Sequence, residues 1–188
     1  MKKIKYIILC LFLAMALCSC MDDKGKIYYS EDQAKFIMPF GEESDYSDIY
    51  VKRVVDGDTL LLANGERVRL IGIDTPEIHE SKKLKKDSER SNQDKSTIKK
   101  LGMRSFDFTR KLVEGKRVSL EFDAERFDRY KRILAYVYLK DGTFVNAEIV
   151  KQGYASLLTI PPNVKYADLF LKLYQEAREN KRGLWGKE

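Results

Sequence analysis

Short apolar runs and turn residues alternate along the chain from Ile49. The runs IYVKRVV, TLLLA and ERVRLIGI are separated by an Asp-Gly pair at residues 56–57 and by Asn64–Gly65. An Asn-Gly pair between two apolar runs is a strong signal for a tight β-hairpin. The pattern therefore predicts three consecutive antiparallel strands over residues 49–73.

The second half of the chain mixes helical and strand patterns. Residues 101–115 carry apolar side chains at helical spacing and end in Gly115, so we expect a helix there. Residues 116–122 and 132–139 are rich in β-branched and aromatic side chains and predict two more strands. We expect a short helix that ends at Gly153, and a final helix with one apolar face made of Tyr166, Leu169, Phe170, Leu173, Tyr174 and Ala177.

These elements predict an α+β fold that is mainly β. About five strands, with one helix after the third and two at the end, suit a five-stranded Greek-key barrel of the OB type with three helices. One face of such a barrel commonly receives nucleic acid or oligosaccharide. At 188 residues, the chain is long enough for one such domain and additional segments.

The first residues have the pattern of an export signal. MKKIKY is basic, and the apolar run that follows is too short for a comfortable transmembrane helix. The run ends in LCSC, which resembles the bacterial lipobox, where the cysteine becomes the acylated first residue. We therefore expect a lipoprotein signal peptide at 1–19, a lipidated Cys20 and an exported protein anchored to a membrane of the bacterial envelope. An ordinary secretory signal is the alternative.

Charge is distributed unevenly along the chain. The net charge is +6 at pH 7, but residues 20–47 carry seven acidic and three basic side chains, which predicts an acidic spacer. The remaining domain, 48–188, is basic and therefore favours an anionic partner. Residues 81–100 carry eight basic and three acidic side chains. We expect a basic insertion there, either a mobile surface segment or an arm that contacts nucleic acid.

Four carboxylates stand in two short turns beside the most apolar strands. Asp56 and Asp58 belong to DGDT, whereas Asp74 and Glu77 belong to IDTPE. Asp favours turns for local reasons, so a purely structural role is open. Two Asp from separate strand ends, with a backbone carbonyl and water, would also make a calcium site, because hard cations prefer several oxygen ligands.

Two arginines interrupt apolar strands. Arg69 lies in RVRLIGI, and Arg132 opens RILAYVYL. A guanidinium group matches two phosphate oxygens at once, which a lysine cannot do. Each arginine taken alone is more simply explained as a surface residue at a sheet edge.

Four motifs in order resemble the staphylococcal nuclease family. They are VVDGDTLLL, RVRLIGIDTPE, DRYKRILAYVY and VNAEIVKQGYA, and a closing RGLW fits the same pattern. The resemblance spans residues 48–186 and is interrupted by 81–100. It implies an OB-fold, calcium-dependent phosphodiesterase that hydrolyses DNA and RNA with little sequence specificity, with single-stranded regions favoured.

The same resemblance implies a role for each motif residue. Asp58, Asp74 and the backbone carbonyl of Thr75 would bind calcium, and Glu77 would activate or orient the attacking water. Arg69 and Arg132 would grip the scissile phosphate. The remaining positions are Tyr130, near the phosphate end of the nucleotide, and Asp56, which would act through water or a neighbouring ligand.

One departure from the family concerns the base of the nucleotide. The best-known member stacks tyrosines on the base after the second helix, whereas the matching SLLTIPPNV has no aromatic residue. Stacking contributes roughly 1–3 kcal/mol per base. We therefore expect weaker nucleotide affinity or an altered base preference.

Other functions remain open at this stage. A non-catalytic nucleic-acid-binding module would keep the barrel without hydrolysis, and an envelope-anchored adhesin would use the same barrel face for oligosaccharide. His79, the sole histidine, lies close to Glu77 in sequence. We expect it to be incidental beside an adequate carboxylate.

Overall fold

The computed structural model describes residues 45–91 and 94–186. The chain divides into Met1–Glu43 and Ser44–Glu188, and the fold below is that of the second unit. The predicted signal peptide, Cys20 and almost all of the acidic spacer lie outside the described residues. Among the helices that the structure describes, none has the length and apolarity needed to span a membrane.

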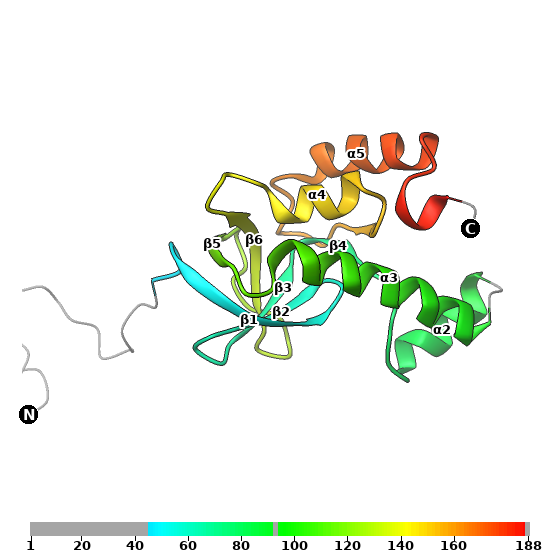
Figure 1. Ribbon diagram of the computed structural model, residues 1–188, viewed down its shortest axis with the longest axis horizontal. Helices are drawn as coiled ribbons and strands as arrows, with labels where there is room; N and C mark the ends of the chain where they lie inside the picture. The colour runs from blue at the N-terminus through cyan, green and yellow to red at the C-terminus, as the bar shows by residue number, and fades with distance from the viewer. Residues whose placement is uncertain (1–44, 92–93, 187–188) are drawn as a thin grey trace, which may run out of the picture. The chain divides into compact units, whose positions relative to one another are not determined.

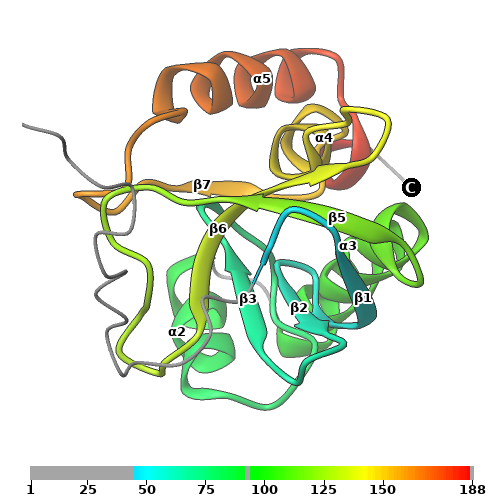
Figure 2. The same cartoon turned by 90° about the vertical axis from the view of Figure 1, so that its left-hand side faces the viewer.

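Five strands close into a barrel, as the sequence predicts. Around the barrel, each hydrogen-bonded to the next, they are β1 (Ile49–Asp56), β2 (Thr59–Leu62), β3 (Arg67–Leu70), β6 (Ile133–Leu139) and β5 (Arg117–Glu121). The pairs are antiparallel except for β3 and β6, which run parallel. Figure 2 shows these strands curving around one core.

The barrel interior is filled by aliphatic side chains from every wall. Val51, Leu60, Val68, Val118 and Val137 are each at most 1% exposed. Each such side chain contributes about 1.5–3 kcal/mol when it leaves water. The alternation of these residues with outward-facing neighbours explains why the strand pattern is legible in the sequence.

The predicted third strand, over 66–73, is divided in two. β3 ends at Leu70, and β4 (Gly72–Asp74) pairs instead with β7 (Ser156–Leu158) in a separate two-stranded sheet. Gly72 has φ +83°, and a Cβ there would lie 2.4 Å from the Phe170 ring. The break therefore needs glycine both for its backbone angle and for its packing.

Helices pack on the barrel and on one another. They are α2 (Lys82–Ser91), α3 (Lys95–Val113), α4 (Val145–Lys151) and α5 (Ala167–Glu179), followed by a 3₁₀ turn, η1 (Gly183–Trp185). In Figure 1, α3 passes along the barrel beside β1, and α2 lies near its N-terminal part. The inner face of α5 contains buried Phe170 and Ala177, but Leu169 is 39% exposed and does not belong to it.

The segment 81–100, predicted as a basic insertion, is helical in its described part. It forms α2 and the first turns of α3, and α3 begins at Lys95 rather than at residue 101. Asp94 caps α3 by accepting the Thr97 N–H at 2.9 Å. Leu84 and Ile98, among the few apolar residues of this segment, are at most 4% exposed. A small apolar content is therefore enough to hold a basic segment against the fold.

The folded unit includes residues just before the predicted start at 48. The Tyr46 ring packs edge-to-face on Phe122, with ring centroids 5.4 Å apart. Its hydroxyl donates to Glu66 at 2.8 Å. The end of the predicted spacer is thus part of the domain.

Candidate active site

Asp58 lies in the tight turn between β1 and β2 and is only 4% exposed. Its Oδ2 accepts both the backbone N–H and the hydroxyl of Thr75, each at 3.0 Å. Its Oδ1 accepts the Thr59 hydroxyl at 3.0 Å. These bonds compensate the cost of burying the carboxylate and hold it in one orientation.

Gly57 lets the same turn approach its neighbours closely. A Cβ at this position would lie 2.7 Å from Thr75 Oγ1, which is closer than real side chains come. On the other side, the Thr109 hydroxyl of α3 donates to the Gly57 carbonyl at 2.7 Å. The DGDT turn is therefore held between the end of β4 and α3, a placement that residue spacing alone does not reveal.

Arg69 joins the two predicted metal carboxylates. On β3 it pairs with Thr59, the residue that follows Asp58. Its Nη2 donates to Asp74 Oδ1 at 2.8 Å, and its Nη1 forms an ion pair with Asp58. One guanidinium group thus brings together acids from two separate strand ends.

Burial is the main influence on Arg69. It lowers the pKa of the guanidinium, and the positive charge of Arg132 lowers it further, whereas Asp74 and Asp56 oppose this change. An arginine pKa begins so high that the group stays protonated. The influence of Arg132 on Arg69 also places the two predicted phosphate-binding arginines within electrostatic reach of each other.

Arg132 is positioned by Asp128, which the sequence does not single out. Asp128 accepts the Arg132 Nε–H at 2.7 Å and the Arg132 backbone N–H at 2.9 Å. It also accepts the Tyr130 backbone N–H at 2.8 Å. Burial raises the pKa of Asp128, but these hydrogen bonds outweigh it and hold the pKa below its ordinary value. In DRYKR, Asp128 stands four residues before Arg132, but this spacing does not by itself show that the two side chains meet. They meet because the chain turns between them, with Lys131 at φ 62°.

Tyr130 presents its ring to solvent beside two guanidinium groups. The ring is on a residue 65% exposed, and Arg132 and Arg129 lie 5.6 Å and 4.8 Å from its centroid. Such contacts attract a cation to the ring face. The predicted substrate-binding tyrosine is therefore adjacent to Arg132 and accessible.

Glu77 is positioned by residues that follow it in the chain. Its Oε2 accepts the Ser81 hydroxyl at 3.2 Å, and the same hydroxyl accepts the Leu84 N–H at 3.0 Å at the start of α2. Glu80 pairs with Lys99 of α3 at 2.6 Å. The predicted catalytic carboxylate is thus tied to the insertion, a link that the sequence does not reveal.

Gly102 of α3 sets the path of the backbone at Glu77. A Cβ there would lie 2.6 Å from the Pro76 carbonyl oxygen and 2.8 Å from that of Glu77. Only glycine allows the 76–77 backbone to lie this close to the helix. Through Thr109 and Gly102, α3 supports both the DGDT turn and the segment that carries Glu77.

The oxygen donors at this point suit a hard cation. Asp58 and Asp74 both contact the Arg69 guanidinium group. Thr75 directly follows Asp74, and its backbone N–H donates to Asp58. Within residues 45–91 and 94–186, His, Cys, Asp and Glu form no cluster of three that could hold a metal. A cation here would therefore draw on two carboxylates, a backbone oxygen and water, a set that Ca²⁺ accepts.

The fold and these residues define an OB-type barrel that carries a carboxylate–arginine site on its wall. Residues 67–187 match the family described as staphylococcal nuclease homologue. The chain belongs to the staphylococcal nuclease family.

Relatives named as nucleases match much of the chain. It is 38% identical over 138 residues to a thermonuclease of Staphylococcus intermedius, covering 72% of this chain and 74% of that protein. It is 30% identical over 171 residues to endonuclease YncB of Bacillus subtilis, covering 88% and 70%. The SPbeta prophage-derived endonuclease YokF of Bacillus subtilis is 35% identical over 145 residues, covering 74% of this chain and 44% of that protein.

Proposed function

We propose that this protein is a calcium-dependent nuclease that hydrolyses phosphodiester bonds of DNA and RNA with little sequence specificity. The observation that carries the proposal is the Arg69 guanidinium, which contacts both Asp58 and Asp74 within electrostatic reach of Arg132. Related proteins named thermonuclease and endonuclease support the reaction class. Single-stranded regions are the favoured substrates because an unpaired strand can bend into a site on a barrel wall.

The arginines would act on the charge of the phosphate. A phosphodiester is an anion, and attack by water gathers more negative charge on its oxygens. Arg69 and Arg132 would stabilise that charge, and an arginine in this role can contribute about 10³–10⁵ in rate. The buried, preorganised Arg69 needs little rearrangement when the charge develops.

Glu77 would orient the attacking water and accept its proton. A carboxylate positioned for general base catalysis contributes about 10²–10⁴ in rate. The hydrogen bond from Ser81 and the packing of the 76–77 backbone on Gly102 limit the positions that this carboxylate can take. Tyr130 would contact the phosphate end of the nucleotide from the exposed side of Arg132.

Asp58, Asp74 and the Thr75 carbonyl are the residues we assign to calcium, with Asp56 acting through water. Their support is the oxygen-only donor set and the meeting of both carboxylates at Arg69. When bound, calcium would supply Lewis-acid and template chemistry toward the phosphate. Calorimetric titration of the full chain with Ca²⁺, and of Asp74→Asn, tests this assignment apart from activity.

Hydrolysis is tested by incubating the full chain with single-stranded DNA in calcium and in chelator. Cleavage that requires calcium and is lost in Glu77→Ser is the expected result. Glu125→Ser is the matched control, because Glu125 is an exposed carboxylate in another loop. Binding without cleavage in calcium would overturn the proposal in favour of a non-catalytic binding module.

The export and anchoring of the protein form a separate part of the proposal. LCSC after an apolar run supports a lipidated Cys20 that tethers the nuclease outside the cytoplasm. Labelling cells with a radioactive fatty acid should mark the full chain and leave Cys20→Ala unlabelled. Label that persists in Cys20→Ala, or release of the unmutated protein without lipid, would overturn the anchor.

A further inference from the structure

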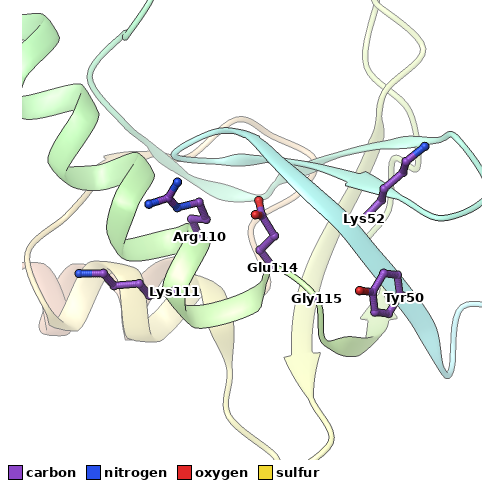
Figure 3. Close-up of a pocket in the computed structure, with 6 residues that line it drawn as sticks. All are labelled: Tyr50, Lys52, Arg110, Lys111, Glu114 and Gly115. Atoms are coloured by element: carbon purple, nitrogen blue, oxygen red, sulfur yellow. The ribbon is translucent and has the colours of Figure 1, made fainter.

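A basic cavity lies beside the N-terminal part of β1, away from the residues assigned above. Its volume is about 470 Å³, and its lining comprises Tyr50, Lys52, Arg110, Lys111, Glu114 and Gly115. Figure 3 shows Tyr50 and Lys52 on the strand, Arg110 and Lys111 on the C-terminal part of α3, and Glu114 directly after the helix. Residues far apart in sequence therefore build one hollow with both an aromatic ring and several cations.

Positive charge prevails in this cavity. Lys52, Arg110 and Lys111 line it, with the two lysine side chains extending away from each other (Figure 3), and the single carboxylate in the lining is Glu114. That carboxylate accepts the Val54 backbone N–H at 2.8 Å, which directs it to the strand. Arg110 also pairs with Asp107 at 3.1 Å. Replacing Lys52 and Lys111 should therefore disturb the surrounding structure less than replacing Arg110.

The cavity is connected to the candidate active site by two rigid elements. Lys52 and Asp56 lie on the same strand, four positions and therefore about 13 Å apart. Arg110 directly follows Thr109, whose hydroxyl bonds the Gly57 carbonyl in the DGDT turn. The cavity and the DGDT turn are therefore a short distance apart along β1 and α3.

We propose that this cavity is a secondary binding site for a phosphate of the single-stranded substrate as it leaves the active site. Lys52 and Lys111 contact the backbone, and Tyr50, which is 42% exposed, offers its ring to a neighbouring base. The site makes long strands better substrates than short ones without adding sequence preference, because phosphate contacts carry no base information. This inference rests on the proposed function, which identifies the ligand as a nucleic acid strand.

The test measures binding of a fluorescent 20-nucleotide single-stranded DNA to the full chain in chelator, at several salt concentrations. Each lost phosphate contact should reduce the slope of log K against log[salt] by roughly 0.7 on single strands. The double variant Lys52→Ala/Lys111→Ala should therefore show a slope shallower by about 1.4. The control Lys151→Ala/Lys172→Ala removes the same charge from exposed positions of α4 and α5 and should keep the original slope.

The outcomes separate this site from the proposed function. An unchanged slope in the cavity variant, or an equal change in the control, would overturn the secondary site, because attraction would then follow net charge alone. In calcium, the cavity variant should cleave the 20-nucleotide strand less efficiently than the unmutated chain does, and should cleave a dinucleotide equally well. Failure of the unmutated chain to cleave either substrate would overturn the nuclease proposal and leave the binding result standing.

Discussion

The two arginines of the candidate site are held in different ways. The Arg69 side chain is 12% exposed in the barrel wall and contacts two carboxylates, Asp58 and Asp74. The Arg132 side chain is 29% exposed at the end of a loop and is held through Asp128. The barrel half of the site is therefore preformed, whereas the loop half can adjust to a ligand at lower cost.

From this difference we expect the barrel half of the site to contribute more to stability than the loop half. Removing one partner of a buried ion pair leaves a charge without compensation, whereas exposed pairs contribute little. The two arginines should thus have similar effects on turnover and unequal effects on unfolding. Substitutions at the two positions test this contrast.

Arg69→Ala should have the largest effect. We expect turnover of single-stranded DNA to fall by about 10³-fold or more. The free energy of unfolding should fall by about 3–5 kcal/mol, because Asp58 stays buried without its cation. Activity assays and urea denaturation measure both quantities.

Arg67→Ala is the matched control for that variant. Arg67 lies on the same strand and is exposed. Its loss should change the free energy of unfolding by no more than about 0.5 kcal/mol. Equal destabilisation by the two substitutions would contradict the assigned difference between buried and exposed positions on β3.

Arg132→Ala should separate chemistry from stability. Turnover should again fall by about 10³-fold or more, while the free energy of unfolding changes by about 1 kcal/mol or less. Exposed Arg129 in the same loop provides the control, since Arg129→Ala should retain most of the turnover. A loss of stability as large as that of Arg69→Ala would show that the loop half is also preformed.

Ser81→Ala should act on turnover through Glu77. Loss of one hydrogen bond changes an interaction by about 0.5–1.5 kcal/mol, so the turnover number should fall by up to about tenfold. The KM for DNA should hardly change, because Ser81 positions Glu77 without binding substrate. Steady-state kinetics of Ser81→Ala and Ser81→Thr measure this, and the threonine variant should recover turnover since it keeps the hydroxyl. Equal losses in both variants would contradict the positioning role.

Asp128 should give the smallest effect, visible as a pH dependence. Its pKa in the folded protein lies below its ordinary value of about 4. The stabilisation by its charged form is therefore complete above about pH 4 and is lost as the pH falls through the lower folded value. Asp128→Asn should unfold more easily than the unmutated chain at pH 6, and this difference should shrink toward pH 2 in denaturation curves. A difference that stays constant with pH would show that the carboxylate charge does not matter.

Much of the barrel is predictable because its strands are short apolar runs bounded by turn residues. The Asn64–Gly65 hairpin and the strand over 132–139 follow from local pattern alone. The break at Gly72 is not predictable in this way, because its cause is the Phe170 ring from a distant helix. Helix α2 is not predictable from local pattern either, since it buries a single leucine, Leu84, in a basic segment.

For the candidate site, motif spacing named the acids and arginines but not the residues that hold them. Asp58 and Arg69 were selected from the sequence, and the structure brings them into contact. Asp128, Ser81 and Thr109 support the site through turn geometry or helix packing, which no local pattern reports. Long-range contacts thus account for most of what sequence reasoning omitted.

The contact of Phe170 with Gly72 has a consequence for the order in which the fold is completed. Phe170 supports the bend that leads to Asp74, and Arg104 of α3 donates to the Gly183 carbonyl at 2.9 Å. Both supports come from residues far along the chain, so a growing chain lacks them while its barrel strands are already made. The segment around Asp74 should therefore reach its final position late in folding.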